Sequence, residues 1–384
     1  MVVARTRNAT PRSGGGKGLP TCDNMPMATL TELNDAGQSV WLDFIRRDML
    51  EDGQLAGLVD DGLRGMTSNP TIFQKAIAAT DLYDEAIAAA DGDSQAVFEA
   101  LAIDDIRTAA DILRPVYDST DGKDGYVSLE VSPTLAYDTA GTIADAKRLW
   151  ALVDRPNLMI KVPATDEGIP AIEELTANDI NVNATLMFGL DDYEAVANAY
   201  VRGAERAEHP EGLASVASFF VSRVDSKTDA ALEKDGSPEA LDLRGNIAVA
   251  NAKLAYDRYR EIFEGEPFAA ANARGARPQR PLWASTSTKN PAYSDVLYVD
   301  ELVGPNTVNT LPPATVDAFR DHGTVDPTAI TTDVEEARAQ IQALADLGID
   351  FAAITAELQT EGVASFAASY EDLLTAIQNQ QAGS

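Results

Sequence analysis

Short apolar runs alternate with longer amphipathic segments along most of the chain, a pattern that indicates strands separated by helices. Eight runs have the length and composition of strands: residues 39–44, 62–67, 125–131, 158–163, 180–188, 215–221, 281–285 and, with the weakest pattern, 306–311. Helix signals lie between them. These are the capping box of Thr29 and Glu32, the Asn69-Pro70 pair, Ser237-Pro238 opening a segment to about Gly265, and Thr332 with Glu335 opening a helix that Gly348 ends.

Eight strand candidates separated by helices predict an α/β fold, a (β/α)8 TIM barrel, in preference to two separate α/β domains. Both arrangements fit a chain of 384 residues that is 45% hydrophobic. No Gly-x-Gly-x-x-Gly or Walker sequence follows any run, so a nucleotide-binding sheet is the weaker alternative. We expect one barrel over residues 28–384, preceded by a leader at residues 1–27.

The leader is basic and rich in Gly, Pro and Ser, which predicts disorder. It lacks the apolar core of a signal peptide, and no later run is long enough to span a bilayer. Cys22 is the only cysteine, so no disulfide framework can form and a reducing compartment fits. We therefore expect a cytoplasmic protein without a membrane partner.

Charge narrows the possible partners further. Asp and Glu total 61 against 30 Lys and Arg, a net charge of -31, and such a surface repels nucleic acid and acidic membrane faces. An anionic small substrate therefore has to be held by a few locally placed cations. The only histidines, His209 and His322, lie beside turn residues and predict surface loops, so neither a metal nor a cofactor is expected.

Polar residues recur near the carboxyl ends of the predicted strands. In a (β/α)8 barrel, side chains from these ends project into one mouth, where catalysis takes place. Taken in the order of the first seven runs, the residues are Asp43, Asn69, Glu130, Lys161, Asn183 with Thr185, Ser218 with Arg223, and Ser285 with Lys289. Their recurrence on successive runs is the main indication of an active site.

Most of these residues have a structural interpretation when taken singly. The alternatives are a helix cap for Asn69, strand or core packing for Thr185 and Ser218, buried ion pairs for Asp43 and Glu130, and solvation at a strand end for Arg223. Lys161 is the hardest to explain in this way, because a lysine is almost never fully buried without a partner or a purpose.

A buried lysine has one chemical use that fits this setting. Burial disfavours the ammonium form, and a neutral amine attacks a ketone or an aldehyde to form a Schiff base. The protonated imine then withdraws electrons, so a neighbouring C–C bond breaks without a metal or an organic cofactor. Carboxylates have to move the protons, and Asp43 and Glu130 face the same predicted mouth.

The chain also resembles a known family, the transaldolases, over nearly everything after residue 28. The matching motifs are "GMTSNPTIF", "VSLEVSPTLAYDT", "LMIKVPATDEGIPAIEEL", "INVNATLMF", "SVASFFVSRVD" and "WASTSTKNPAYSD". The long form, with extra helices, an insertion between strands six and seven and a "YVDELVGPNTVNTLPPAT" stretch, is similar to the branch typical of actinobacteria. This resemblance implies a pentose phosphate pathway enzyme that acts on sugar phosphates without a cofactor.

The resemblance also implies roles for the catalytic residues. Transaldolases form a Schiff base between the strand-four lysine and a ketose phosphate, release an aldose, and pass the retained dihydroxyacetone unit to another aldose phosphate. Lys161 matches that lysine, and Asp43 matches the aspartate that moves the proton of the C4 hydroxyl. Glu130 and Thr185 match the pair that orders the catalytic water.

The remaining matches concern substrate binding. Asn69, Asn183 and Ser218 match the residues that bind the hydroxyls of the three-carbon unit in the family. Arg223 and Ser285 match its phosphate contacts. Phe220 matches the phenylalanine whose ring forms a wall of the site. Two departures stand out. After the seventh strand, this chain has "ASTSTKN", which is two residues longer than the Ser-Phe-Arg stretch of short transaldolases and places Lys289 where those have arginine. In the sixth strand, it has "SFF", without the proline that often separates the serine from the phenylalanine.

Two other functions stay open from the sequence. A fructose-6-phosphate aldolase releases dihydroxyacetone to water, but the resemblance implies that it lacks the glutamate seen here as Glu130, and Phe220 argues against it as well. A catalytically inactive sugar-phosphate-binding barrel is the alternative from another class, and the complete set of lysine, aspartate and glutamate argues against that. The sequence does not define an oligomeric state.

Overall fold

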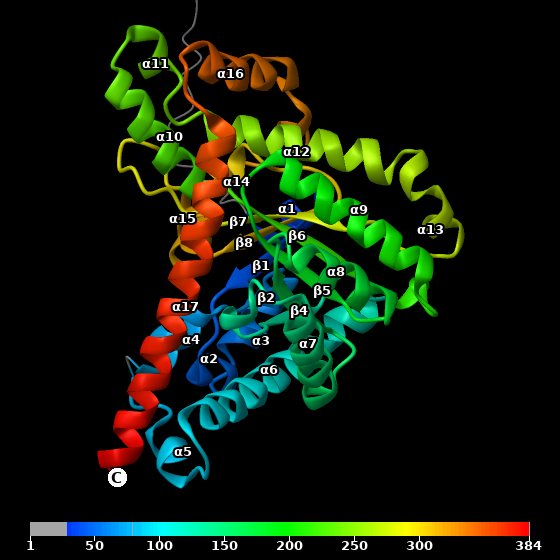
Figure 1. The fold of residues 1–384 in the computed structure, drawn as a ribbon, viewed down its shortest axis with the longest axis vertical. Helices are drawn as coiled ribbons and strands as arrows, with labels where there is room; N and C mark the ends of the chain where they lie inside the picture. The colour runs from blue at the N-terminus through cyan, green and yellow to red at the C-terminus, as the bar shows by residue number, and fades with distance from the viewer. Residues whose placement is uncertain (1–28, 79, 384) are drawn as a thin grey trace, which may run out of the picture.

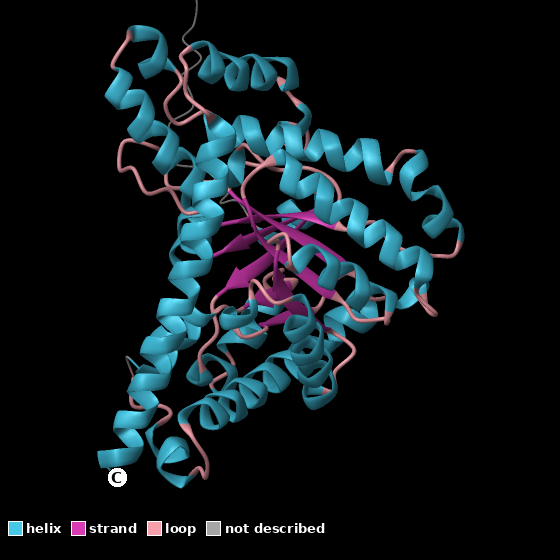
Figure 2. Cartoon of the chain, in the orientation of Figure 1, coloured by secondary structure: helices cyan, strands magenta, loops and turns pink. Residues whose placement is uncertain are grey.

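A closed barrel of eight parallel strands forms the centre of the computed structural model, which describes residues 29–78 and 80–383 (Figures 1 and 2). The strands follow one another around the barrel in chain order, and β8 pairs with β1. They are β1 (Gln38–Asp43), β2 (Gly65–Thr67), β3 (Tyr126–Glu130), β4 (Leu158–Pro163), β5 (Val182–Met187), β6 (Ser215–Phe220), β7 (Arg280–Ala284) and β8 (Thr307–Leu311). All eight predicted strands, and the TIM-barrel fold, are confirmed. The predicted leader lies outside the described residues.

Helices surround the barrel and connect its strands. Those before β6 are α1 (Leu30–Asp35), α2 (Arg47–Glu51), α3 (Gln54–Asp60), α4 (Pro70–Ala78), α5 (Asp84–Ala89), α6 (Ser94–Ser119), α7 (Thr139–Val153), α8 (Gly168–Ala177) and α9 (Leu190–Arg206). Those after β6 are α10 (Ser222–Asp235), α11 (Pro238–Asp242), α12 (Ile247–Phe263), α13 (Ala269–Ala273), α14 (Leu297–Asp300), α15 (Pro313–His322), α16 (Val334–Asp346) and α17 (Phe351–Gly383). Single 3-10 turns form η2 (Pro133–Leu135), η3 (Pro210–Gly212), η4 (Glu266–Phe268) and η5 (Ala329–Thr331).

The predicted helix caps near the N-terminus are present. Thr29 accepts from the backbone N–H of Glu32 while the Glu32 side chain accepts from that of Thr29, which completes the capping box. Asn69 Oδ1 accepts a hydrogen bond from the N–H of Ile72 at 2.9 Å, so Asn69 caps α4. Gly348 adopts a φ of +75° just after α16, as a helix-ending glycine should.

The segment that opens at Ser237 is two helices where the sequence predicted one. Ser237 caps α11, but the chain turns at Gly245, which has a φ of +73°, before α12 begins at Ile247. The carboxylate of Asp229 accepts from the N–H of Gly245 at 3.0 Å and so fixes this turn. A glycine with positive φ interrupts the helix at little steric cost, although the apolar periodicity continues across it.

The prediction that Thr332 and Glu335 cap a helix is wrong. The Thr332 hydroxyl donates to the carbonyl of Thr328 at 2.9 Å, so it serves the preceding turn η5. The next helix, α16, begins at Val334 after Asp333, which has a φ of 59° and gives no side-chain cap. A threonine hydroxyl can donate to a preceding backbone carbonyl or accept from a following N–H, and the sequence alone does not decide between these two hydrogen bonds.

The predicted insertion between strands six and seven is present as α10 to α13. α12 packs against α9, α10, α16 and β7, so the insertion adds a layer over one side of the barrel. Figure 1 shows α12 and α16 together at the top of the view. In the described part of the chain, no helix is both long enough and apolar enough to cross a membrane.

The last helix, α17, extends along one side of the barrel and is drawn in red in Figure 1. It contacts α4, α5, α6, α10, β5 and η2, which lie around the strand ends that carry the predicted site. Ser369 shares a hydrogen bond of 2.8 Å with Thr71 on α4, and Lys227 on α10 forms ion pairs with Glu357 and Glu361 on α17. The carboxyl ends of the strands are therefore covered by the C-terminal part of the chain.

A buried ion pair lies at the opposite end of the barrel, where the strands begin. Arg280 at the start of β7 donates to Asp124 Oδ1 at 2.9 Å and to the Ser39 hydroxyl at 2.8 Å, and Ser39 in turn donates to Asp124 Oδ2 at 2.7 Å. The two charged side chains are only 9% and 7% exposed. The Trp41 indole also donates to Asp124, so the network joins β1, β7 and the segment before β3.

We expect Asp124→Ala to lower the free energy of unfolding by about 3 to 5 kcal/mol, because it leaves the Arg280 charge buried without its partner. Urea denaturation measures this change. Asp111→Ala is the control, since Asp111 is 58% exposed in its pair with Arg155 and should contribute less than about 1 kcal/mol. Equal losses in the two variants would contradict a structural role for the buried network.

Candidate active site

Lys161 lies on β4, a strand whose residues are all buried, and its side chain is 5% exposed. Its Nζ donates to the carbonyl of Ser68 at 3.2 Å and lies 3.7 Å from Oε2 of Glu130. The pairing register of the barrel explains this contact, because Glu130 on β3 is directly opposite Lys161 on β4. Neighbouring strands therefore place a lysine and a glutamate side by side at the carboxyl end of the barrel.

A cavity of about 470 Å³, here called the mouth, opens above Lys161. Eight of the residues predicted from the sequence line it: Asp43, Asn69, Lys161, Ser218, Phe220, Arg223, Ser285 and Lys289. They come from β1, β4, β6 and the segments that follow β2, β6 and β7. The structure thus brings together residues more than 200 positions apart, as the barrel interpretation required.

Glu130 and Thr185 do not line the mouth but lie beside it. Both are buried side chains, and Glu130 Oε2 and Thr185 Oγ1 have no hydrogen-bond partner among the described residues. Buried polar atoms are rarely left unpaired in native structures, so each of these atoms has hydrogen-bonding capacity for a further polar group such as water.

A bulge in β5 sets the position of Thr185. The pairing between β5 and β6 shifts between Ala184 and Met187, and Leu186 adopts a φ of 61°, which is strained for a bulky side chain. The Gln359 side chain on α17 donates to the carbonyl of Leu186 at 3.3 Å and to that of Ala164 at 2.9 Å. α17 therefore supplies hydrogen bonds that the irregular strand end would otherwise lack.

Burial raises the pKa of Glu130 from 4.5 to about 7, and the positive charge of Lys161 acts in the opposite direction. The negative charge of Asp43 adds a small further rise. A carboxyl group with a pKa near neutrality can both give and take a proton at physiological pH. Glu130 therefore has the electrostatic properties of a general acid and base.

Asp43 ends β1 at the rim of the mouth. Its Oδ1 accepts a hydrogen bond from the Thr67 hydroxyl on β2 at 2.8 Å, which fixes the direction of the carboxylate. Asn69 follows β2 and uses its Oδ1 to cap α4, so its amide NH₂ is the group left for a substrate. The structural interpretation of Asn69 as a helix cap is therefore confirmed, and its contact with a substrate stays a prediction.

Asn183 and Ser218 form a buried hydrogen-bonded chain. Ser218 donates to Asn183 Oδ1 at 2.7 Å, and Asn183 Nδ2 donates to the Ser128 hydroxyl at 3.0 Å. Ser218 lines the mouth, whereas Asn183 does not. Asn183 lies directly opposite Lys161 in the strand register, beneath the residues of the cavity wall.

The cations of the mouth lie on the side of β6 and β7. Arg223 is in the first turn of α10, just beyond the end of β6, and its guanidinium lies 5.3 Å from the centre of the Phe220 ring. Burial lowers the pKa of Arg223, whereas the charge of Asp43 raises it. The pKa of Lys289 is also lowered, by desolvation first and then by the charges of Arg223 and Lys75. These cations thus lie close enough to repel one another.

Ser285 follows β7 in a left-handed conformation with a φ of 57°. Its hydroxyl shares a hydrogen bond of 2.9 Å with that of Ser222, and its carbonyl accepts from the N–H of Ser222. The Lys289 Nζ donates to the Ser287 hydroxyl at 2.6 Å. Non-glycine residues with positive φ cost energy and are often found at functional sites, which fits a role for Ser285 at the mouth.

Among the mouth residues that the sequence analysis missed are Lys75, Ser365 and Phe366. Lys75 lies on α4, and no motif in the sequence singled it out. Ser365 and Phe366 come from α17, and the Phe366 ring centre lies 5.8 Å from Lys161 Nζ. No local pattern indicates that a helix so distant in sequence covers Lys161.

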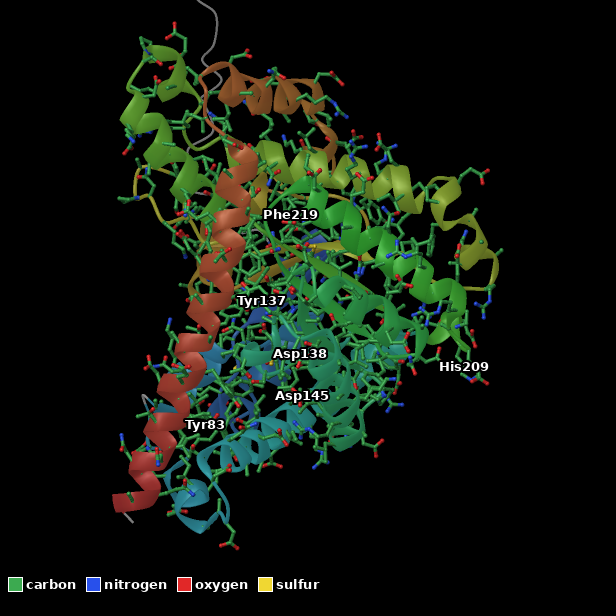
Figure 3. The ribbon with its side chains drawn as sticks, in the orientation of Figure 1. Tyr83, Tyr137, Asp138, Asp145, His209 and Phe219 are labelled. Atoms are coloured by element: carbon green, nitrogen blue, oxygen red, sulfur yellow. The ribbon has the colours of Figure 1, made fainter. Side chains whose placement is uncertain are left out.

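The two histidines lie away from the mouth. His209 is exposed, as predicted, and is labelled at the edge of the molecule in Figure 3; its ring, Asp179 and Glu208 have possible metal ligand atoms within 4.8 Å of one another. Exposed acidic groups often approach one another in this way without binding metal. His322 is the last residue of α15 and is also exposed, so its prediction as a loop residue is corrected to a helix end.

The described residues thus form a (β/α)8 barrel whose mouth combines a buried lysine, the carboxylate of Asp43 and a cluster of cations, with Glu130 beside them. Residues 40–377 match the Transaldolase/Fructose-6-phosphate aldolase family. The chain is 51% identical to a transaldolase of Frankia alni over 91% of its length and 97% of that relative. It is 51% identical to one of Thiobacillus denitrificans (90% and 98%) and 49% identical to one of Thermobifida fusca (92% and 98%).

The chain belongs to the transaldolase family. It is therefore an enzyme, a transferase of the transaldolase type, and the resemblance seen in the sequence, including that to actinobacterial members, is confirmed. Schiff-base chemistry, the pentose phosphate pathway and sugar-phosphate substrates follow from the family.

The raised pKa of Glu130 predicts a pH dependence of stability. Because the folded state holds this proton more tightly than the unfolded state, its contribution is full below pH 4.5 and is lost as the pH rises through about 7. Across this window the wild type should lose roughly 1 to 3 kcal/mol relative to Glu130→Gln, since one pKa unit corresponds to about 1.4 kcal/mol. Urea denaturation on both sides of the window measures this difference, and parallel pH curves would contradict it.

Proposed function

We propose that Lys161 is the Schiff-base nucleophile of this transaldolase and that the other residues of the mouth serve that reaction. The enzyme passes a dihydroxyacetone unit from sedoheptulose 7-phosphate to glyceraldehyde 3-phosphate, giving erythrose 4-phosphate and fructose 6-phosphate. The observation that carries the proposal is the contact of 3.7 Å between Lys161 Nζ and Glu130 Oε2, with both side chains buried and Lys161 facing the mouth.

Imine formation needs both members of this pair. The neutral amine of Lys161 adds to the ketone carbon, and a proton passes from nitrogen to oxygen to give the carbinolamine. A second proton, from Glu130, then allows the C–O bond to break with release of water. The products are a protonated imine on Lys161 and a carboxylate on Glu130, whose charges stabilise each other. Thr185 orients the water beside Glu130.

Cleavage of the carbon chain needs a separate base. Asp43 takes the proton of the C4 hydroxyl, the C3–C4 bond breaks, and its electrons move into the imine as an aldose leaves. The three-carbon unit stays attached to Lys161 until an acceptor aldose reverses these steps. Asn69 and Ser218 hold its hydroxyls, and Asn183 acts with them through its hydrogen bond to Ser218.

Phosphate binding is assigned to the cations at the far side of the mouth. Apart from Lys161, the charged side chains among the described residues of the mouth are three cations and one carboxylate. The cations are Arg223, Lys289 and Lys75, and the carboxylate is Asp43. In a chain with a net charge of -31, this local excess of cations supports an anion site. Ser285 is positioned to add a hydroxyl contact, and Phe220 forms the apolar wall next to Arg223.

The aldolase alternative differs in what becomes of the three-carbon unit. A fructose-6-phosphate aldolase releases dihydroxyacetone to water, and the matching family includes such enzymes by name. The curated relatives at about half identity bear the name transaldolase, and Glu130 and Phe220 are both present. Transfer to an acceptor is therefore the better supported activity, and an inactive sugar-phosphate-binding barrel is supported by no observation.

The setting of the enzyme is inferred from the sequence. The single cysteine supports a cytoplasmic location, and the acidic composition argues against nucleic acid as a partner. The eight strands of one closed barrel support a single catalytic unit over residues 28–384. No metal or organic cofactor is needed in the proposed reaction.

Lys161→Arg should abolish the adduct that borohydride forms with fructose 6-phosphate, and also transfer to erythrose 4-phosphate, because arginine stays charged and cannot form an imine. Mass spectrometry of the reduced adduct measures the first effect. Lys147→Arg is the matched control, since Lys147 is exposed on α7 and its side chain donates to Asn178 on the outside of the barrel. An adduct on the Lys161 variant would place the nucleophile elsewhere.

Arg223→Ala should weaken binding of fructose 6-phosphate by about 1.5 to 3 kcal/mol, the range for a hydrogen bond to a charged group. Free dihydroxyacetone, which has no phosphate, should be trapped by the variant nearly as well as by the wild type. Concentration series of both compounds in the borohydride assay measure these two effects. Equal losses on both compounds would make Arg223 a structural residue of α10.

A further inference from the structure

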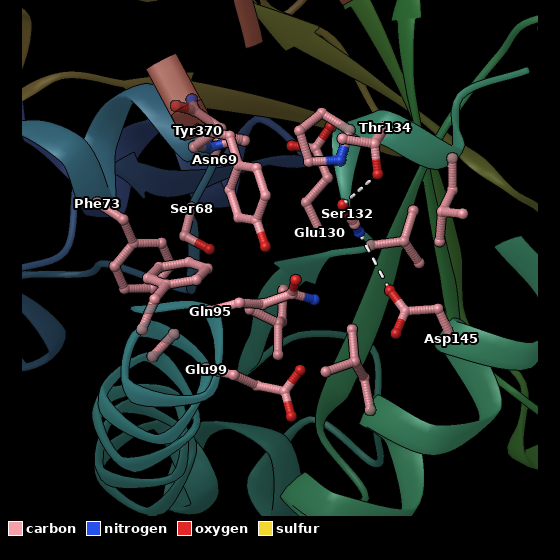
Figure 4. Close-up of a pocket in the computed structure, with 18 of the residues that line it drawn as sticks. Ser68, Asn69, Phe73, Gln95, Glu99, Glu130, Ser132, Thr134, Asp145 and Tyr370 are labelled. Carbon is pink, nitrogen blue, oxygen red and sulfur yellow. Dashed lines mark hydrogen bonds between the residues drawn. The ribbon is translucent and has the colours of Figure 1, made fainter. Parts of the chain in front are cut away.

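A second cavity lies behind Glu130, on the side away from the mouth (Figure 4). This rear cavity has a volume of about 330 Å³ and is bounded by α4, α6, α7, α17 and the loop after β3. Glu130 lines the rear cavity and Lys161 lines the mouth, and among the described residues only Asn69 lines both. The Glu130–Lys161 pair therefore stands at the boundary between two separate spaces.

The rear cavity leads from Glu130 to the molecular surface. The Glu130 side chain is 4% exposed, whereas Gln95, Thr134 and Glu371, which line the same cavity, are exposed. Polar groups lie between these two ends. Ser132 shares a hydrogen bond of 2.8 Å with Thr134, and its N–H donates to Asp145 at 3.1 Å. Tyr370 on α17 points into the same space in Figure 4.

The charges of the rear cavity are opposite to those of the mouth. Four carboxylates line it, those of Glu99, Glu130, Asp145 and Glu371, against one cation, Arg148. Arg148 is already paired with Glu99 and Asp145. A phosphorylated sugar is therefore repelled from the rear cavity and attracted to the mouth. Water is neutral and small enough to enter the rear cavity, where hydroxyl, amide and carboxylate groups can bind it.

Schiff-base chemistry moves water into and out of the site. Each imine that forms releases one water, and each hydrolysis consumes one. At both moments a ketose fills the mouth, and Phe366 covers Lys161 from α17. The water has to reach the carbon attached to Lys161 on the side of Glu130, which is the side that the rear cavity serves.

We propose that the rear cavity is a water passage that supplies and removes the water of the imine steps while a sugar phosphate occupies the mouth. The proposal rests on the proposed role of Lys161. In the forward step the C–O bond of the carbinolamine breaks as Glu130 gives its proton to the hydroxyl, and the water passes into the rear cavity. In hydrolysis a water from the rear cavity gives a proton to Glu130 and its oxygen to the imine carbon.

The passage can be tested by following the ketone oxygen of the substrate. Fructose 6-phosphate with a heavy-oxygen label on its carbonyl is incubated with the enzyme and with carbon-labelled glyceraldehyde 3-phosphate. Any ketose that acquires the carbon label has passed through the imine. In the wild type, water leaves by the passage and mixes with solvent, so those molecules should have lost the heavy oxygen. If the passage is blocked, the same water returns and the oxygen label is retained.

Two substitutions narrow the passage at different points. Ala102→Leu adds side-chain volume at a buried position on α6 that lines the cavity, and Gln95→Trp narrows the exposed end, where folding is little at risk. Ala100→Leu is the matched control, because Ala100 is an exposed residue of the same helix outside the cavity lining. Mass spectrometry of the recovered ketose gives the fraction that carries both labels.

We expect several-fold more doubly labelled ketose from both passage variants than from the wild type and Ala100→Leu. A general loss of activity would lower the carbon label without raising this fraction, so a merely structural effect is distinguishable. If the wild type forms the borohydride adduct on Lys161 and the passage variants lose the oxygen label as fully as the control, the passage is refuted. If the wild type forms no adduct, the proposed function itself fails.

Discussion

The contact between Lys161 and Glu130 is the interaction on which the rest of the site depends. Strand register makes it, because a parallel β3–β4 pair aligns the two residues at the same level of the barrel. Burial strengthens this contact, because two charged groups interact more strongly in a desolvated site. Either charge buried without its partner would destabilise the fold. The same burial raises the pKa of Glu130 to about 7, so this carboxyl group can both give and take a proton near neutral pH.

Charge is distributed so that the two faces of this pair have different neighbours. Cations gather on the mouth side, and carboxylates gather behind Glu130. With 61 acidic residues in the chain, a cluster of carboxylates is expected from composition alone. A cluster of cations at the mouth is not expected from that composition. They are arranged on three separate elements, α4, α10 and the loop after β7, so none of these elements supplies the cluster alone. The barrel brings scattered lysines and an arginine together at one cavity.

The sequence predicted the strands and the burial of Lys161 correctly because both follow from the local pattern of apolar and polar residues. Each strand is a short apolar run, and a lysine inside one stands out because hydrophobic burial normally excludes it. Patterns failed where a contact other than the expected one decides the outcome. Asp229 fixes the turn at Gly245 from another helix, and the Thr332 hydroxyl donates to the preceding turn at Thr328 and not to the helix that follows. Phe366 reaches Lys161 from α17, and an amphipathic helix shows that it packs on something without showing on what.

α17 shows why the site depends on the whole chain. The strained bulge at Leu186 leaves carbonyls that β6 does not pair, and Gln359 bonds one of them together with that of Ala164 after β4. This links the ends of the strands that carry Lys161 and Thr185, while Phe366 covers the amine from the same helix. A β-bulge is tolerated where its free groups find partners. α17 thus supports the geometry of the strand ends on which Lys161 and Thr185 lie.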